Sequence, residues 1–180
     1  AQELEQDAGV RVVVFTGAGD EAFSAGADIK DFDRYRSDSA KAKVYAAAFD
    51  GALDATEALS KPTVCLIKGF CVGGGCELAM ATDIRVAANN SRFGIPVARL
   101  GILVGYGEMR RLVNLVGPGN ASYILLSGRL IDAQEALRIG LVHRVLTLDE
   151  IKDGSYDLAL EMASLAPLSH RRNKQILQTV

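Results

Sequence analysis

The chain has 180 residues, of which 49% are hydrophobic and 23% charged, as is ordinary for a globular protein of one domain. Its 20 basic residues nearly balance 22 acidic ones, so the electrostatic signature of a nucleic-acid-binding protein is absent. The longest apolar runs are far too short to cross a bilayer, and we expect no membrane segment. Three cysteines without a CxxC pair predict a reducing, cytoplasmic environment. With only two histidines, no multi-histidine metal centre is expected.

The first part of the chain predicts a short helix and a strand, followed by irregular segments. The helix at residues 2–7 leads into a β-branched run at residues 10–16, which is typical of a strand buried on both faces. Residues 20–31 lack a helical period and are expected to form a loop or a short extended piece. Residues 32–39 are polar and are expected to be a mobile surface excursion.

A long helix is predicted at residues 40–59, and it ends before Pro62. Its apolar positions include Val44, Ala47 and Ala48, which we expect to face the core or a ligand pocket. Strands and helices alternate from there to the end of the chain, which predicts an α/β fold. Further strands are expected at 63–70, 83–88, 92–97 and 141–146, and further helices at 76–82, 108–116, 121–126, 132–139 and from 148 onward.

Three glycines at positions 73–75 separate a predicted buried strand from a predicted helix. Glycines allow a ligand to approach the backbone, and the helix start presents unpaired N–H groups. Such a turn can hold an anion or an oxyanion that develops during a reaction. Glu77 follows Gly74 by three residues, so its carboxylate is a candidate general acid or base on the same face. The alternative is that the glycines only permit tight packing and that Glu77 interacts with the helix dipole.

A second segment of small residues, at positions 23–30, also follows a predicted strand end. It could present another backbone N–H group at the same edge of the sheet. Two N–H groups from separate loops would form an oxyanion hole. Alone, this segment is weak evidence, because loops of small residues are common.

The two segments, in this order, resemble the enoyl-CoA hydratase/isomerase (crotonase) family. Four stretches carry the resemblance, which covers most of the chain, from about residue 9 to residue 145. They are highly specific to the superfamily and much less specific to one reaction. The four stretches are residues 16–30, 61–64, 69–85 and 127–142.

The resemblance implies an α/β, crotonase-like spiral of ββα units, of which this chain would hold the core portion with both ends truncated. Residues 1–146 would be the CoA-binding and catalytic core, and residues 147–180 the start of a C-terminal helical region. The family is usually assembled as homotrimers or dimers of trimers. No metal or redox cofactor is implied, since coenzyme A is part of the acyl-CoA substrate, and neither nucleic acid nor membrane is an expected partner.

The resemblance also assigns a site. The backbone amides of Ala27 and Gly74 would hold the thioester oxygen, each contributing roughly 2.7–4 kcal/mol to lowering the barrier. Glu77 would be the catalytic acid or base. The residues expected to bind substrate or coenzyme A are Ala25, Ala27, Asp28, Ile29, Lys30, Gly73, Gly74 and Val97, with Lys30 near the nucleotide.

One position departs from the family pattern. Family hydratases typically use two glutamates, and Val97 stands where the second belongs. Glu108 could reach the site, although a role at a helix start is favoured for it. We therefore expect an enoyl-CoA hydratase-like lyase, with a double-bond isomerase, a thioester hydrolase or a non-catalytic acyl-CoA-binding protein as alternatives.

Two rival readings come from local motifs. Cys71 lies where a nucleophile elbow would place its nucleophile, and Asp83 with His143 or His170 could complete a triad. In this reading Glu77 has no role. Residues 17–22 match the glycine pattern of a dinucleotide site, but no helix is predicted to follow them.

Overall fold

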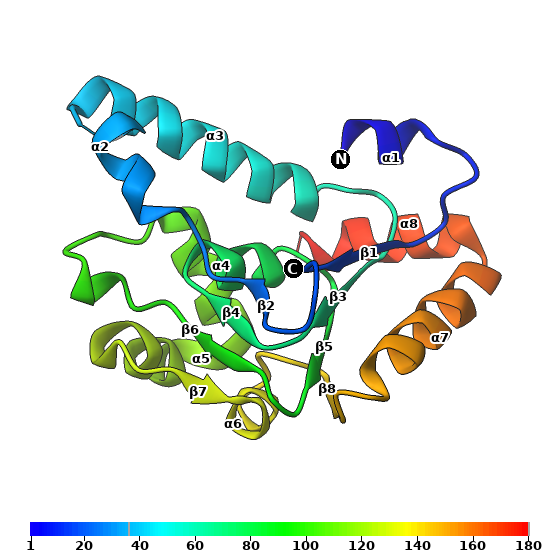
Figure 1. Ribbon diagram of the computed structural model, residues 1–180. Coiled ribbons are helices and arrows are strands. Elements are labelled where there is room, and N and C mark those ends of the chain that lie inside the picture. Colours follow the sequence, from blue (N-terminus) through cyan, green and yellow to red (C-terminus); the bar gives the residue numbers. More distant parts are fainter. Residues whose placement is uncertain (36, 180) are drawn as a thin grey trace.

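Two four-stranded sheets form the centre of the molecule in this computed structural model, which describes residues 1–35 and 37–179 (Figure 1). The strands of the first sheet are parallel and run in the order β1 (Val13–Thr16), β3 (Thr63–Ile67), β5 (Ile84–Ala88), β8 (Arg144–Leu146). The second sheet has the order β2 (Ala22–Ser24), β4 (Phe70–Val72), β6 (Arg92–Gly94), β7 (Ile131–Asp132). Its β6–β7 pair is antiparallel, and its other two pairs are parallel.

The first six strands alternate between the two sheets. The pairs β1–β2, β3–β4 and β5–β6 each place one strand in each sheet, and each pair leads on to a helix. The chain thus winds as a spiral of ββα units, which confirms the predicted fold class. The ends of β2, β4 and β6 lie side by side in this spiral, so the segments that follow them are brought together.

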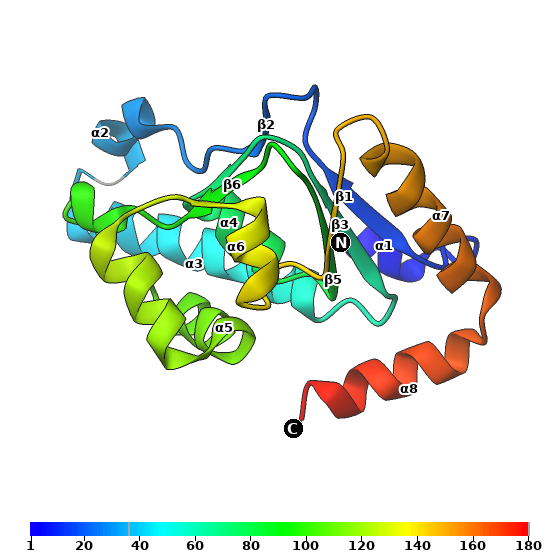
Figure 2. The same ribbon diagram turned by 90° about the horizontal axis from the view of Figure 1, so that it is seen from below.

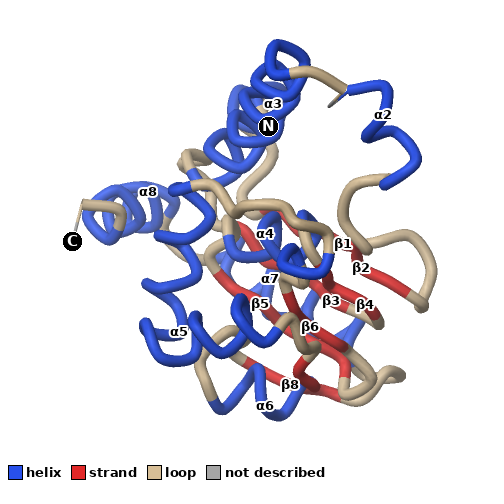
Figure 3. Tube along the Cα trace, turned by 90° about the vertical axis from the view of Figure 1, so that its left-hand side faces the viewer, coloured by secondary structure: helices blue, strands red, loops and turns tan. Residues whose placement is uncertain are grey.

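Helices cover both sides of the first sheet, with α7 on one side and α3, α4 and α5 on the other (Figures 2 and 3). None of the helices in the described part of the chain has the length and apolar character needed to cross a membrane. The helices are α1 (Gln2–Gln6), η1 (Ile29–Asp31), α2 (Phe32–Tyr35), α3 (Ser39–Glu57), α4 (Gly74–Met80), η2 (Val97–Arg99), α5 (Tyr106–Ser127), α6 (Ala133–Arg138), α7 (Ile151–Ser164) and α8 (Pro167–Leu177).

Strand β3 separates two hydrophobic clusters. Cys65 and Ile67 belong to the larger one, which extends to α4, α5 and α6. Val64 and Leu66 belong to the smaller one, beneath α7. All five residues of β3 are buried, which confirms the predicted buried strand. Strand β1, predicted to be buried on both faces, has only Val13 buried and Thr16 exposed, so that prediction was wrong.

Several predicted boundaries were wrong. Residues 20–31 contain β2 and η1, and the supposed polar excursion contains α2, because short elements of three or four residues leave no periodic pattern. By contrast, the two helices predicted on either side of Gly117 are confirmed: α5 consists of two helices that meet at a break at Gly117, whose φ is +74°. The strand predicted from residue 10 begins only at Val13.

The orientation predicted for α3 was also wrong. Val44 is 71% exposed, and Ala47 and Ala48 are exposed with it. The inward face carries Phe49 and the fully buried Leu53 instead. A helix rich in alanine has apolar residues on several faces, so spacing alone does not identify the buried one.

Replacing Gly75 by alanine should destabilise the fold, because its methyl group would lie 2.6 Å from Cβ of Ser24 and even closer to the Ser24 carbonyl. We expect a loss of about 1–3 kcal/mol in the free energy of unfolding, measured by urea denaturation. Gly51→Ala is the control, because that exposed position in α3 has no atom within 4 Å of the added methyl group. It should gain about 0.5–1 kcal/mol. Equal stabilities for the two variants would contradict the close contact.

Candidate active site

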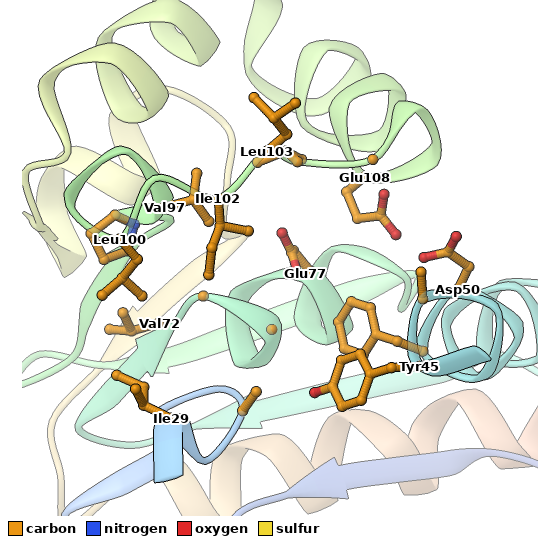
Figure 4. A pocket seen from close by; sticks show the side chains of 18 of the residues that line it. Ile29, Tyr45, Asp50, Val72, Glu77, Val97, Leu100, Ile102, Leu103 and Glu108 are labelled. Carbon is orange, nitrogen blue, oxygen red and sulfur yellow. The ribbon is translucent and has the colours of Figure 1, made fainter. Parts of the chain in front are cut away.

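A cavity of about 500 Å³ lies where the spiral brings four segments together (Figure 4). Its volume is in the range of small-molecule binding sites. The first wall is the loop after β2, and the second is the inward face of α3. The turn from β4 into α4 forms the third wall, and the chain from Pro96 to Glu108 closes the fourth.

The two segments of small residues meet at this cavity. A Cβ atom added to Gly26 would lie 3.1 Å from the backbone nitrogen of Gly74 and 3.1 Å from the carbonyl oxygen of Val72. The loop after β2 therefore lies directly against the start of α4. Ala25, Ala27, Gly73 and Gly74 all line the cavity, so backbone from both segments faces the same space.

Glu77 extends into the middle of the cavity from the first turn of α4 (Figure 4). Its side chain is largely buried, with the residue 8% exposed. Val97, at the start of η2, also lines the cavity. The position that the family pattern gives to a second glutamate is therefore apolar in the folded site, and it cannot move a proton.

The predicted substrate-binding residues divide into two groups. Ile29 lines the cavity together with the alanines, glycines, Glu77 and Val97 already named. Asp28 and Lys30 do not line it; both are exposed, and the Lys30 backbone N–H donates to Asp28 Oδ1 at 2.9 Å. Their predicted contact with coenzyme A remains a prediction.

Sequence reasoning missed several lining residues, among them Tyr45 and Asp50, which line the cavity from α3 on the face that helical spacing did not identify. Glu108, the third residue of α5, does lie at a helix start, but it is 3% exposed and also lines the cavity. In the sequence, the signal for this position was that residues 105–111 differ from the glycine-rich loop that the family has there.

The surroundings of Glu108 favour its protonated form. Burial raises the pKa of Glu108, and the nearby Asp50 carboxylate raises it further, whereas the Glu108 backbone N–H and Arg111 act in the opposite direction. The Arg111 guanidinium, however, is held by α3, with Nη2 lying 2.5 Å from Asp54 Oδ1 and 2.7 Å from Glu57 Oε2. The net effect is a pKa of Glu108 above its ordinary value.

Neither rival motif forms a site. Burial raises the pKa of the Cys71 thiol well above its ordinary value, so its thiolate is disfavoured. Asp83 accepts from Lys174 Nζ at 2.7 Å, and His143 Nδ1 accepts from the backbone N–H of Arg85 at 3.1 Å, so neither is arranged as a triad partner. The glycine motif at residues 17–22 runs into β2 rather than into a helix.

No group of three or more histidine, cysteine or acidic side chains among residues 1–35 and 37–179 is arranged to hold a metal ion. The polar groups around the cavity are backbone amides, carboxylates, a tyrosine and an arginine. This set suits acid–base chemistry on an organic substrate.

Comparison with known proteins identifies the family. The family model described as "Enoyl-CoA hydratase/isomerase" matches residues 2–180. The chain is 38% identical over 175 residues to the "Short-chain-enoyl-CoA hydratase" of Clostridium acetobutylicum, covering 97% of this chain and 66% of that protein. It is 39% identical over 171 residues to the "Crotonyl-CoA hydratase" of Syntrophomonas wolfei, covering 95% of this chain and 65% of that protein.

Comparison with a solved structure supports the same family. The "enoyl-CoA hydratase/ carnithine racemase from Magnetospirillum magneticum" superposes with a TM-score of 0.96 at 37% identity, covering 99% of this chain and 67% of that one. The chain thus spans about two thirds of the length of the relatives it matches. It belongs to the enoyl-CoA hydratase/isomerase family.

Proposed function

We propose that the protein containing this chain is an enoyl-CoA hydratase-like lyase, which adds water to, or removes it from, the Cα–Cβ bond of an acyl-CoA. The observation that carries the proposal is the position of Glu77, whose carboxylate shares one cavity with backbone from two separate glycine-bearing loops. Two relatives that are 38% and 39% identical are named as hydratases of enoyl-CoA or crotonyl-CoA, which supports the same reaction type.

In the proposed reaction, negative charge develops on the thioester oxygen, and the site is arranged to stabilise it. Attack of water on Cβ sends electrons toward the thioester oxygen, which becomes an enolate oxygen. The N–H groups of Ala27 and Gly74 would donate hydrogen bonds to that oxygen and stabilise it more strongly as its charge develops. Glu77 would remove or supply a proton beside the reacting carbons. No metal or redox cofactor is required, since coenzyme A enters as part of the substrate.

Because Val97 stands where a second glutamate is expected, alternative functions stay open. A double-bond isomerase or a thioester hydrolase could work with the carboxylate of Glu77 alone, whereas hydration needs both a proton at Cα and an activated water at Cβ. A protein that only binds acyl-CoA would need no proton transfer at all. These alternatives differ in product and are separated by the measurements below.

Assembly and location form a further part of the proposal. We propose a homotrimer or a dimer of trimers, because large apolar side chains such as Leu103, Tyr106 and Leu126 are more than four-fifths exposed on the isolated chain. We also propose a cytoplasmic protein, because Cys65, Cys71 and Cys76 are all free and buried.

Glu77→Gln should abolish hydration, because the amide keeps the shape of the side chain but cannot transfer a proton. We expect kcat for crotonyl-CoA to fall by about 10²–10⁴-fold, with binding of the substrate retained. The measurement follows the loss of the enoyl-thioester absorbance with the complete protein.

Full activity in Glu77→Gln would contradict the proposed role of this carboxylate. Binding of crotonyl-CoA by the wild type without any turnover would reject the hydratase assignment. Product analysis with a 3-enoyl-CoA and with saturated acyl-CoAs would then distinguish an isomerase, a hydrolase and a binding protein.

A further inference from the structure

One carboxyl oxygen beside the cavity has no partner. Glu108 Oε1 is fully buried, and no hydrogen-bond donor among the described residues reaches it; the nearby side chain is the Asp50 carboxylate. A buried polar atom normally has a partner, and a missing one costs stability. Because Glu108 lines the cavity, a bound water or substrate can supply the partner that the protein lacks.

The position of Glu108 complements that of Glu77. Glu77 extends from α4, whereas Glu108 extends from the start of α5, and both carboxyl groups face the same cavity (Figure 4). Val97 lies on the wall formed by η2. A second carboxyl group is thus present in the site, but it comes from a position eleven residues after the one where the family pattern has its second glutamate.

The groups around Glu108 bear on its protonation. From α3, the exposed Asp50 carboxylate faces it, and the negative charge of Asp50 disfavours ionisation of Glu108. On its own helix, Arg111 would favour the ionised form, but Asp54 and Glu57 compete for that guanidinium. Tyr45 and Glu77 are the other titratable groups on the adjacent walls.

We propose that Glu108 is the second catalytic group of this site, and that it delivers the proton to Cα while Glu77 takes the proton from water. This inference rests on the proposed function. The water oxygen bonds to Cβ as its proton passes to Glu77, and the electrons of the C=C bond form an enolate. The proton of Glu108 then bonds to Cα. Transfer of the proton from Glu77 to Glu108 through solvent restores the starting state.

The test measures two reactions of the complete protein. Hydration of crotonyl-CoA requires both carboxyl groups. Exchange of the Cα hydrogens of butyryl-CoA in D₂O, followed by NMR, requires only the group that serves Cα, which takes a proton in its ionised form and then returns a deuteron from solvent. Glu108→Gln should lower both rates by about 10²-fold or more. Glu77→Gln should lose hydration and keep the exchange.

Glu135→Gln is the matched control. Glu135 is the third residue of α6, as Glu108 is of α5, but it lies outside the cavity. If Glu108 acted only at the helix start, the two variants would lose similar stability and both would keep full activity. That result would overturn the inference and leave the proposed function intact.

The remaining outcomes also either overturn or retain the assignment of Glu108. Absence of Cα exchange in the wild type, or exchange lost in Glu77→Gln but kept in Glu108→Gln, would overturn the assignment of Glu108. A wild type that does not hydrate crotonyl-CoA, but whose Cα exchange depends on Glu108, would reject the hydratase and retain the inference.

The Asp50→Asn variant tests, through the pH dependence of kcat, whether Glu108 supplies the proton. Asp50 is a positioning residue, since its negative charge helps to raise the pKa of Glu108. Activity requires protonated Glu108, so kcat should fall as the pH rises through the pKa of that group. Without the Asp50 charge, this alkaline limb should move to lower pH, while KM changes little. An unchanged pH profile would show that Glu108 is not the titrating group and would overturn the inference.

Discussion

Direct contact between backbone segments is the constraint on which the site depends. Gly69, at a φ of +60°, lies against the carbonyl of Glu21, and Gly75 lies against Ser24. A side chain at either glycine would push strand β2 away from β4 and α4. Because the loop carrying Ala27 continues directly from β2, its position relative to Gly74 is set by this contact rather than by the loop itself.

The parts that could be predicted from sequence are those with a local physical signature. The buried strand Thr63–Ile67 has a continuous apolar run, and the start of α6 has a capping residue, Asp132, whose Oδ1 accepts from the backbone N–H of Glu135 at 2.8 Å. The glycines at the start of α4 similarly indicated a close backbone approach before any tertiary structure was known. Each of these signals depends on residues within one element.

The parts that could not be predicted depend on neighbours distant in the chain. The inward face of α3 is selected by what it packs on, such as the contact of Phe49 with Gly74, and alanine spacing carries no such information. Glu108 has the sequence context of an ordinary helix start, and its burial arises only because α3 crosses the same cavity. The short elements β2, η1 and α2 were missed because their boundaries come from pairing and packing.

The arrangement around Arg111 also bears on which acyl groups the cavity can accept. Its guanidinium is engaged by Asp54 and Glu57 of α3, so it does not neutralise both Asp50 and Glu108 at the cavity wall. A ligand group bearing a carboxylate at this wall would bring a further negative charge close to Asp50 and Glu108, which opposes its binding there. The charge of the cavity wall therefore depends partly on the ion pairs of Arg111, a residue that does not itself line the cavity.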